Sequence, residues 1–272
     1  MIHAAKKSLG QHFLNNPSLA QKIVRLADLQ KGDFVLEIGP GRGILTLALL
    51  HTGARVVAIE KDRDLVLVLR EKFKGTENLE IVEGDALEIL NVGAPTQGCP
   101  TKVIANLPYN IATEVIFRLL DQKEKFSDFF LMVQKEVAER LAAGPGSKRY
   151  GILSVLTQIH ADIKIVHKVA PTAFFPKPKV DSAVVHFKIL PALRFPVDGF
   201  SFFKQVVKAS FASRRKKLSN SLLDHLDLPP PVYLKLTKEK IEAVFEEIGL
   251  KPDLRAESLP LEKFVALANA LY

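Results

Sequence analysis

Short apolar runs alternate with longer amphipathic segments over the first half of the chain. The runs have the length of buried strands, and the segments between them carry apolar residues at helical spacing. Strands are expected at Phe34–Ile38, Arg55–Glu60, Leu79–Glu83, Lys102–Asn106 and Asp128–Gln134, and helices at Gly43–His51, Arg63–Phe73 and Ala112–Leu120. This alternation predicts an α/β fold in which helices cover both faces of a parallel sheet.

The pattern changes after residue 190. Two further strands, Ile163–Val169 and Ser182–Leu190, are joined by a proline-rich stretch, and a turn-rich patch at Pro191–Gly199 follows them. Beyond it only helical periodicity is found, at Phe200–Ala212, Arg214–Leu226, Lys238–Ile248 and Leu261–Leu271. We therefore expect a first domain over residues 1–191 and a small all-helical domain over residues 192–272.

Composition narrows the class of protein. The 272 residues are 47% hydrophobic, which is ample for a packed core, and carry a formal net charge of +8 with a pI near 9.4. A basic chain of this kind favours an anionic partner, with nucleic acid ahead of an acidic protein or a membrane surface. Cys99 is the single cysteine, so an internal disulfide and a thiolate metal cluster are excluded, as expected for a reducing cytoplasm. No apolar run is long enough to span a bilayer.

The tetrapeptide Asn106-Leu107-Pro108-Tyr109 follows one of the predicted strands and suits a specific chemistry. The N6 amine of adenine is a poor nucleophile, and an Asn side-chain oxygen together with a backbone carbonyl can accept both of its hydrogens. Proline fixes φ and removes a competing donor. Tyrosine offers a flat face on which an unstacked base can lie. The alternative is an ordinary turn with a packed tyrosine.

Residues suited to binding a cofactor lie at or after the ends of three other predicted strands. Gly39, Gly41 and Gly43 come directly after the first strand and Glu37, where glycines let the backbone approach a ligand. The dinucleotide fingerprint is not met, because position 44 is isoleucine. Glu60 can accept hydrogen bonds from both hydroxyls of a ribose, and Asp85 can accept from the amine of an adenine. Since ligands of α/β sheets bind at the carboxyl ends of strands, these residues predict an S-adenosylmethionine site.

The chain resembles the small-subunit (16S-type) ribosomal RNA adenine N6,N6-dimethyltransferase family nearly from end to end. Besides the groups above, the resemblance is carried by Ser8–Leu14, Glu60-Lys61-Asp62, Gly84-Asp85-Ala86, Gln134-Lys135-Glu136, Phe174–Ser182 and Ser213–Lys217. It implies a Rossmann-like class I methyltransferase domain with a seven-stranded, mostly parallel sheet, followed by a small helical domain.

The resemblance also implies roles for individual residues. The expected cofactor-binding residues are His12, Leu14, Gly39, Gly41, Glu60, Asp85 and Asn106. Asn106, Leu107 through its carbonyl, Pro108 and Tyr109 are expected to handle the target amine, with Phe174 against the other face of the base. His12 stands where many members have asparagine, so an amide contact to the methionine part of the cofactor does not carry over directly.

A dense group of cations lies in the helical tail. Between residues 199 and 223 there are six basic residues and no acid, a distribution that favours phosphate binding over an ordinary solvated helix face. The expected RNA-binding residues are Lys204, Lys208, Arg214, Arg215, Lys216 and Lys217, with Lys177 and Lys179, and with Lys6 and Lys7 as an extension of the track. Arg214 and Arg215 suit bidentate phosphate contact.

These features lead to one functional hypothesis. The protein is expected to be a cytoplasmic monomer that binds the small ribosomal subunit and methylates N6 of two adjacent adenosines in a loop of its 16S-type RNA, with a role in ribosome biogenesis. Transfer from S-adenosylmethionine is a direct displacement, and no metal-ligand spacing occurs in the sequence. Two alternatives remain: a large-subunit RNA adenine dimethylase that confers antibiotic resistance, and a non-catalytic ribosome-assembly or transcription factor.

Overall fold

The computed structural model describes residue 6 and residues 10–93, 102–227 and 236–272. Cys99 and Lys7 lie outside these ranges. The described chain forms two compact units, Met1–Ala138 with Asp162–Ile189, and Glu139–Ala161 with Leu190–Tyr272. The stretch Glu139–Ala161, which the sequence pattern placed with the first domain, groups with the C-terminal helices. A boundary between residues 191 and 192 remains a prediction.

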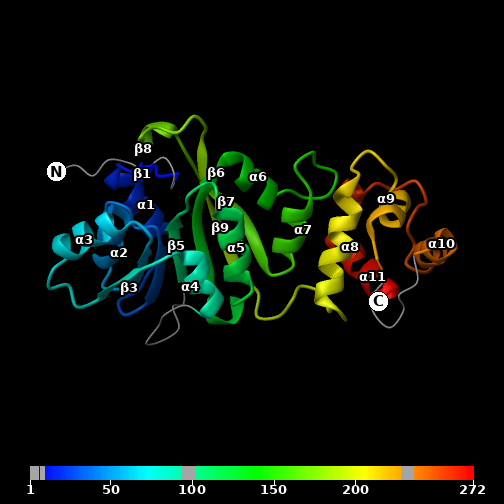
Figure 1. Ribbon diagram of the computed structural model, residues 1–272, viewed down its shortest axis with the longest axis horizontal. Helices are drawn as coiled ribbons and strands as arrows, with labels where there is room; N and C mark the ends of the chain where they lie inside the picture. Colours follow the sequence, from blue (N-terminus) through cyan, green and yellow to red (C-terminus); the bar gives the residue numbers. More distant parts are fainter. Residues whose placement is uncertain (1–5, 7–9, 94–101, 228–235) are drawn as a thin grey trace. The chain divides into compact units, whose positions relative to one another are not determined.

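A seven-stranded sheet forms the first unit (Figure 1). Its strand order is β4-β3-β2-β5-β6-β9-β7. The first five strands in this order are parallel to one another, and β9 runs antiparallel to β6. The strands are β2 (Phe34–Ile38), β3 (Arg55–Glu60), β4 (Leu79–Glu83), β5 (Lys102–Asn106), β6 (Asp128–Gln134), β7 (Ala161–Val169) and β9 (Ser182–Ile189). The predicted α/β class and mostly parallel sheet are confirmed, with strand ends within two residues of those expected.

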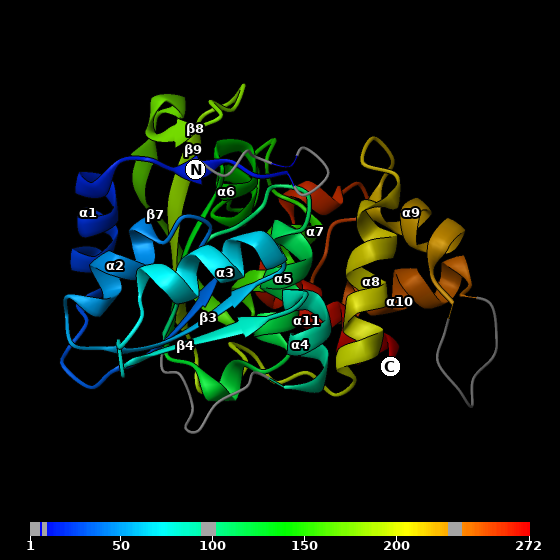
Figure 2. The same cartoon turned by 60° about the vertical axis from the view of Figure 1, so that its left-hand side comes forward.

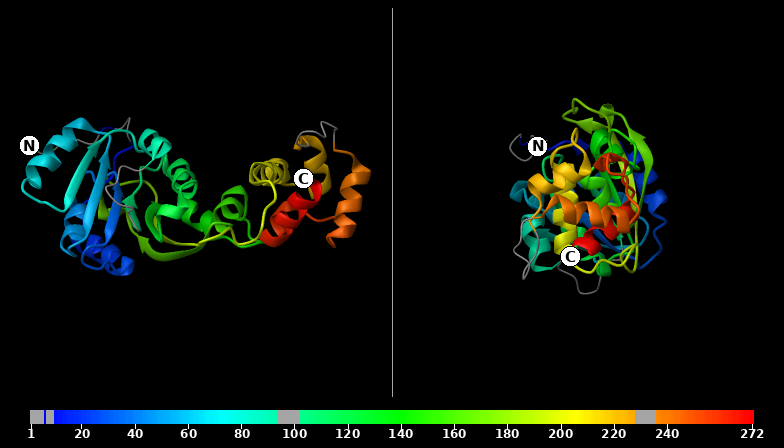
Figure 3. Two further views of the ribbon diagram at one scale, coloured as in Figure 1. Left: turned by 90° about the horizontal axis from the view of Figure 1, so that it is seen from below. Right: turned by 90° about the vertical axis from the view of Figure 1, so that its right-hand side faces the viewer.

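Helices lie on both sides of this sheet (Figure 3). They are α1 (Pro17–Ala27), α2 (Ile44–Leu50), α3 (Arg63–Lys72), α4 (Ala86–Val92), α5 (Ala112–Leu120) and the first part of α6 (Lys135–Leu141). Figure 2 shows α3 lying across β3 and β4. The buried faces of α1 and α2 pack on sheet residues such as Val35, Val56 and Ile104 to form a hydrophobic core. This core fixes the strand ends from which the candidate site is built.

Two short strands form a second, small sheet in the first unit. β1 (Phe13–Leu14) pairs antiparallel with β8 (Phe174–Phe175), so that Phe13 faces Phe175 and Leu14 faces Phe174. Neither strand was expected, because a run of two residues gives no periodic signal. Their pairing joins the N-terminal segment to the segment after β7.

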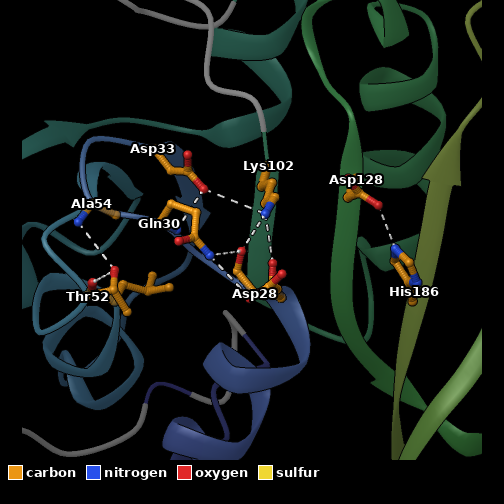
Figure 4. A network of polar contacts seen from close by, with 10 residues as sticks. Asp28, Gln30, Asp33, Thr52, Ala54, Lys102, Asp128 and His186 are labelled. Carbon is orange, nitrogen blue, oxygen red and sulfur yellow. Dashed lines mark hydrogen bonds and ion pairs between the residues drawn. The ribbon is translucent and has the colours of Figure 1, made fainter.

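Polar contacts connect the amino-terminal ends of the sheet strands to neighbouring segments (Figure 4). The Lys102 ammonium, at the start of β5, donates to the backbone carbonyls of Ala27 at 2.8 Å and Asp28 at 3.0 Å, and lies 3.6 Å from the Asp33 carboxylate. His186 Nε2 is 2.7 Å from the Asp128 carboxylate and links β9 to β6. These contacts fix the end of the sheet that lies opposite the candidate site.

The second unit is helical in its described part. It contains α7 (Ile152–Gln158), α8 (Phe200–Ala212), α9 (Leu218–His225), α10 (Lys238–Glu247) and α11 (Leu261–Leu271), with a core that includes Phe203, Phe211 and Phe264. Helix α9 begins at Leu218, four residues later than the pattern predicted. The delay has a physical reason: residues 214–217 are all cationic, and cations are unfavourable at the positive N-terminal end of a helix.

Candidate active site

A pocket lies at the carboxyl ends of β2, β3, β4 and β5. Its wall contains residues 37–42 at the end of β2 and in the loop that follows, Glu60 and Lys61 at the end of β3, Gly84 and Asp85 after β4, and residues 106–111 from the end of β5 onward. Residues 10–14 form the remaining side. All four predicted strand-end motifs therefore meet in one cavity. The individual roles of these residues remain predictions.

The glycine-rich loop leaves room for a ligand because its backbone turns sharply. Gly41 has φ +57°, and a β-carbon at this position would lie 3.0 Å from the Phe13 ring. The Lys72 ammonium supports the loop from behind by donating to the carbonyl of Arg42 at 2.8 Å and of Gly43 at 3.3 Å. The loop is therefore supported by α3, and Gly41 faces the Phe13 ring of the N-terminal segment.

Glu60 is fixed by two backbone donors. Its carboxylate accepts from Gly41 N at 3.1 Å and from Asp62 N at 2.9 Å, and the residue is 7% exposed. Burial raises the pKa of Glu60, and the two backbone N–H groups oppose that shift. Each oxygen keeps further lone pairs, so the carboxylate can still accept hydrogen bonds from a ribose.

Asp85 performs two structural tasks at the end of β4. One carboxylate oxygen accepts from Leu87 N at 2.9 Å and caps α4, and the other lies 2.7 Å from the Lys61 ammonium. The ammonium of Lys61 lowers the pKa of Asp85. An adenine amine that binds Asp85 would therefore share this carboxylate with Lys61.

The Asn106 side chain has a defined orientation. Its Nδ2 group donates to the backbone carbonyl of His12 at 3.1 Å. Because a carbonyl only accepts, this bond assigns the nitrogen to the His12 side and leaves Oδ1 as the acceptor. The neighbouring Leu107 N donates to the Met132 carbonyl at 3.1 Å, which fixes the backbone of the same turn.

The Tyr109 ring stands beside Asn106 in the pocket wall. Its hydroxyl is 2.7 Å from Ser182 Oγ, and its ring stacks on that of His12 at a centroid distance of 5.5 Å. Burial raises the pKa of Tyr109. The Nδ1 atom of His12 lies 2.7 Å from the Pro176 carbonyl. Because a carbonyl only accepts, Nδ1 carries the proton in this contact. His12 thus connects the aromatic wall to the segment after β8.

Phe174 lies in the core rather than in the pocket wall, and its expected stacking on the base stays a prediction. The residue is 2% exposed. The exposed neighbour is Phe175, which is 55% exposed and lies 5.7 Å from the Arg42 guanidinium. Successive residues of a strand point to opposite faces, so the pairing of β8 with β1 turns Phe174 inward.

Glu37, the acid that precedes the glycine loop in the predicted cofactor site, lies in the pocket wall. Its side chain is almost fully buried at 1% exposure, and Oε2 has no hydrogen-bond partner within the described protein. Burial raises the pKa of Glu37 to about 8, and Thr46 opposes the shift. The sequence pattern placed Glu37 at the predicted cofactor site but did not predict its burial.

The predicted RNA-binding cations differ in their contacts. Arg214 donates to the carbonyls of Lys148 and Tyr150, each at 3.1 Å, and pairs with Glu257 at 3.4 Å. Lys216 pairs with Asp224 at 2.7 Å, and the Lys204 ammonium lies over the Phe200 ring. Lys177, Lys179, Lys208, Arg215 and Lys217 are exposed. Arg214 therefore has a structural role, and Arg215 is the better arginine for a phosphate contact.

The described residues contain no group of three or more His, Cys, Asp or Glu side chains placed to hold a metal ion. None of the described helices has the length and apolar character needed to cross a membrane. Lys6 is described and lies on the first unit, where it pairs with Asp62 and Asp64.

The strand order and the pocket at its carboxyl edge define a Rossmann-like class I methyltransferase. Within that class the chain belongs to the ribosomal RNA adenine dimethylase family, whose model matches residues 2–269. It is 46% identical over 271 residues to the ribosomal RNA small subunit methyltransferase A of Syntrophotalea carbinolica, covering 100% of this chain and 98% of that protein.

Two crystal structures are also similar over nearly the whole chain. A dimethyladenosine transferase from Plasmodium falciparum is 28% identical with a TM-score of 0.79, covering 94% of this chain and 96% of that one. The 23S rRNA methyltransferase ErmE is 26% identical with a TM-score of 0.71, covering 95% of this chain and 99% of that one. The resemblance to the ribosomal RNA adenine dimethyltransferase family, given from the sequence motifs, is thus confirmed.

Proposed function

We propose that this protein transfers methyl groups from S-adenosylmethionine to N6 of two adjacent adenosines in a loop of small-subunit ribosomal RNA. It would act in the cytoplasm as a monomer during ribosome biogenesis, with the small subunit or its 16S-type RNA as partner. The observation that carries the proposal is the fixed amide of Asn106, whose Oδ1 is the acceptor in a pocket that also holds Glu60 and Asp85.

The residues of the pocket fit this cofactor. Gly39 and Gly41 both have positive φ, which suits glycine, and a β-carbon at Gly41 would lie 3.0 Å from the Phe13 ring. Glu60 would hold the ribose hydroxyls, Asp85 the adenine amine, and the unpartnered Oε2 of Glu37 offers an acceptor at the loop. When bound, the cofactor supplies an electrophilic methyl group.

The chain itself contributes orientation. Oδ1 of Asn106 and the Leu107 carbonyl would accept the two hydrogens of the target amine, which directs its lone pair toward the methyl group. The Tyr109 ring would stack on the base, an interaction of roughly 1–3 kcal/mol. Positioning of this kind and exclusion of water account for catalysis without a covalent enzyme intermediate.

The substrate assignment has a specific competitor. The similarity to ErmE leaves a large-subunit RNA dimethylase as the second candidate. Identity to small-subunit methyltransferases is higher, at 46% against 26%, and favours the small subunit. A non-catalytic assembly factor is disfavoured because the acceptor side chains of the pocket are present and oriented.

A competition experiment tests the substrate. Unmodified small and large ribosomal subunits are mixed at equal concentration with the protein and radiolabelled S-adenosylmethionine, and the two RNAs are then separated. Label in the small-subunit RNA supports the proposal. Label in the large-subunit RNA alone would assign the protein to the second candidate function. Cofactor binding without label in either RNA would support the assembly factor.

A further inference from the structure

The side of the pocket away from the strand ends is closed by residues Gly10–Leu14, which we call the N-terminal strap. At its carboxyl end the strap is held by the β1–β8 pairing, and Asn15 N donates to the Ala173 carbonyl at 2.9 Å. All residues of the strap contribute to the pocket wall. The strap is therefore part of the cofactor side of the site.

At its amino end the strap is held by Asp62. Gln11 Nε2 donates to Oδ2 of Asp62 at 2.9 Å, and the Lys6 ammonium lies 2.6 Å from Oδ1. The Asp62 side chain is 0% exposed, and Oδ1 also accepts from Asp64 N at 3.1 Å as the N-cap of α3. A buried carboxylate that accepts from Gln11, Lys6 and the backbone of Asp64 is a strong and specific anchor, because an unpaired charge there would be costly.

The Gln11 amide cannot turn over in this arrangement. Its Oε1 accepts from Lys6 N at 2.8 Å while its Nε2 donates to Asp62. Both ends of the amide are thus used, and the hydrogen-bond polarity of the Gln11–Asp62 contact is fixed. This polarity can be reversed by design.

The centre of the strap reaches the proposed catalytic side chains. The carbonyl of His12, the residue after Gln11, accepts from Asn106 Nδ2 at 3.1 Å, and the His12 ring stacks on Tyr109. The carbonyl that orients Asn106 is therefore one residue away from the side chain that Asp62 holds. A displacement of Gln11 would move this carbonyl.

We propose that Asp62 is a positioning residue: through Gln11 it holds the N-terminal strap against the cofactor site and so sets the orientation of Asn106. Asp62 touches neither the target base nor the reacting atoms in this assignment. This inference rests on the proposed function, but its effect on cofactor affinity is measured without RNA and is therefore separable from methyl transfer.

The proposal is tested by exchanging the hydrogen-bond donor and acceptor between Gln11 and Asp62. Gln11→Glu places two carboxylates in contact, and Asp62→Asn removes the charge that Gln11 and Lys6 share. Each single variant should raise the dissociation constant of S-adenosylhomocysteine, and lower the single-turnover rate at saturating cofactor, on the order of tenfold. The double variant Gln11→Glu with Asp62→Asn restores a donor opposite an acceptor and should recover both quantities to within about threefold of the parent.

Gln30→Glu is the matched control, because it makes the same change as Gln11→Glu. Gln30 also donates from Nε2 to an aspartate, Asp28 at 3.3 Å, but it lies at the opposite edge of the sheet (Figure 4). This control should bind cofactor and react as the parent does. Thermal melting of every variant establishes that it is folded.

Two results would overturn the proposal. One is parental cofactor affinity and rate in both single variants, and the other is a double variant as impaired as the two singles combined. If the parent protein fails to methylate small-subunit RNA, the proposed function fails, but the affinities for S-adenosylhomocysteine still decide whether Asp62 holds the strap.

Discussion

Asn106 donates a hydrogen bond from Nδ2 to the backbone carbonyl of His12, 94 residues earlier in the chain, at 3.1 Å. This bond connects the end of β5 to the N-terminal segment and selects which atom of the amide is available as an acceptor. The chemistry proposed for the pocket depends on that selection, since only an oxygen can accept the hydrogens of an adenine amine.

Substitution of Tyr109 should separate ring stacking from the hydroxyl contact. Tyr109→Phe keeps the ring and loses the 2.7 Å contact with Ser182, at a cost of about 1 kcal/mol or a few-fold in kcat/KM. Tyr109→Ala also loses the stacking face and should cost roughly 1–3 kcal/mol more. Initial rates of methyl transfer at several RNA concentrations measure both. Equal activity of the two variants would exclude a stacking role.

Glu37 should make stability depend on pH in an unusual direction. Its pKa in the folded protein is about 8, above the usual value of 4.5. Between these values the folded protein retains a proton that the unfolded chain releases, so the contribution of Glu37 to stability decreases as pH rises from about 5 to about 8. The decrease is on the order of a few kcal/mol.

The variant Glu37→Gln isolates this effect, because glutamine stays neutral at every pH. Urea unfolding of both proteins across the range should show the variant gaining stability relative to the parent as pH rises. A constant difference across the range would show that Glu37 is ionised throughout.

The two adjacent phenylalanines of β8 should respond differently to truncation. Phe174 is buried in the core, so Phe174→Ala should lower the free energy of unfolding by about 3–5 kcal/mol. Phe175 is 55% exposed, and Phe175→Ala should change it by less than about 1 kcal/mol. Chemical denaturation measures both variants. A larger loss at position 175 would mean that Phe174 is not the core residue.

Arg214 and Arg215 should separate stability from RNA binding. Arg214→Ala removes two hydrogen bonds to carbonyls and an ion pair, and it should lower stability by about 1–2 kcal/mol. Arg215→Ala should leave stability unchanged and weaken RNA binding, with the slope of log K against log salt reduced by about 1. Thermal melting and filter binding at several salt concentrations measure these effects. A parental salt slope for Arg215→Ala would remove Arg215 from the RNA surface.

The parallel sheet and its strand-end polar residues were predictable because each leaves a local signal. A buried strand produces an apolar run, Glu60 and Asn106 each end one, and Asp85 follows one after a single glycine. The β1–β8 pairing left no such signal, because it joins segments about 160 residues apart. Without it, the inward direction of Phe174 could not be known.

The polar contacts were also beyond prediction from the pattern. Arg214 stands in a run of cations, and only the fold brings the carbonyls of Lys148 and Tyr150 to its guanidinium. The burial of Glu37 and Asp62 likewise depends on which elements cover them. Residue type and spacing indicate that a charge is present, whereas its partner is set by tertiary structure.

The most direct test of the central claim is the identity of the methylated nucleoside. Small ribosomal subunits that lack dimethyladenosine are incubated with the protein and S-adenosylmethionine, and their RNA is digested to nucleosides and analysed by mass spectrometry. The account predicts N6,N6-dimethyladenosine at two adjacent positions, with none formed by the Asn106→Ala variant. Methylation at another atom, or dimethyladenosine formed equally well by Asn106→Ala, would contradict it.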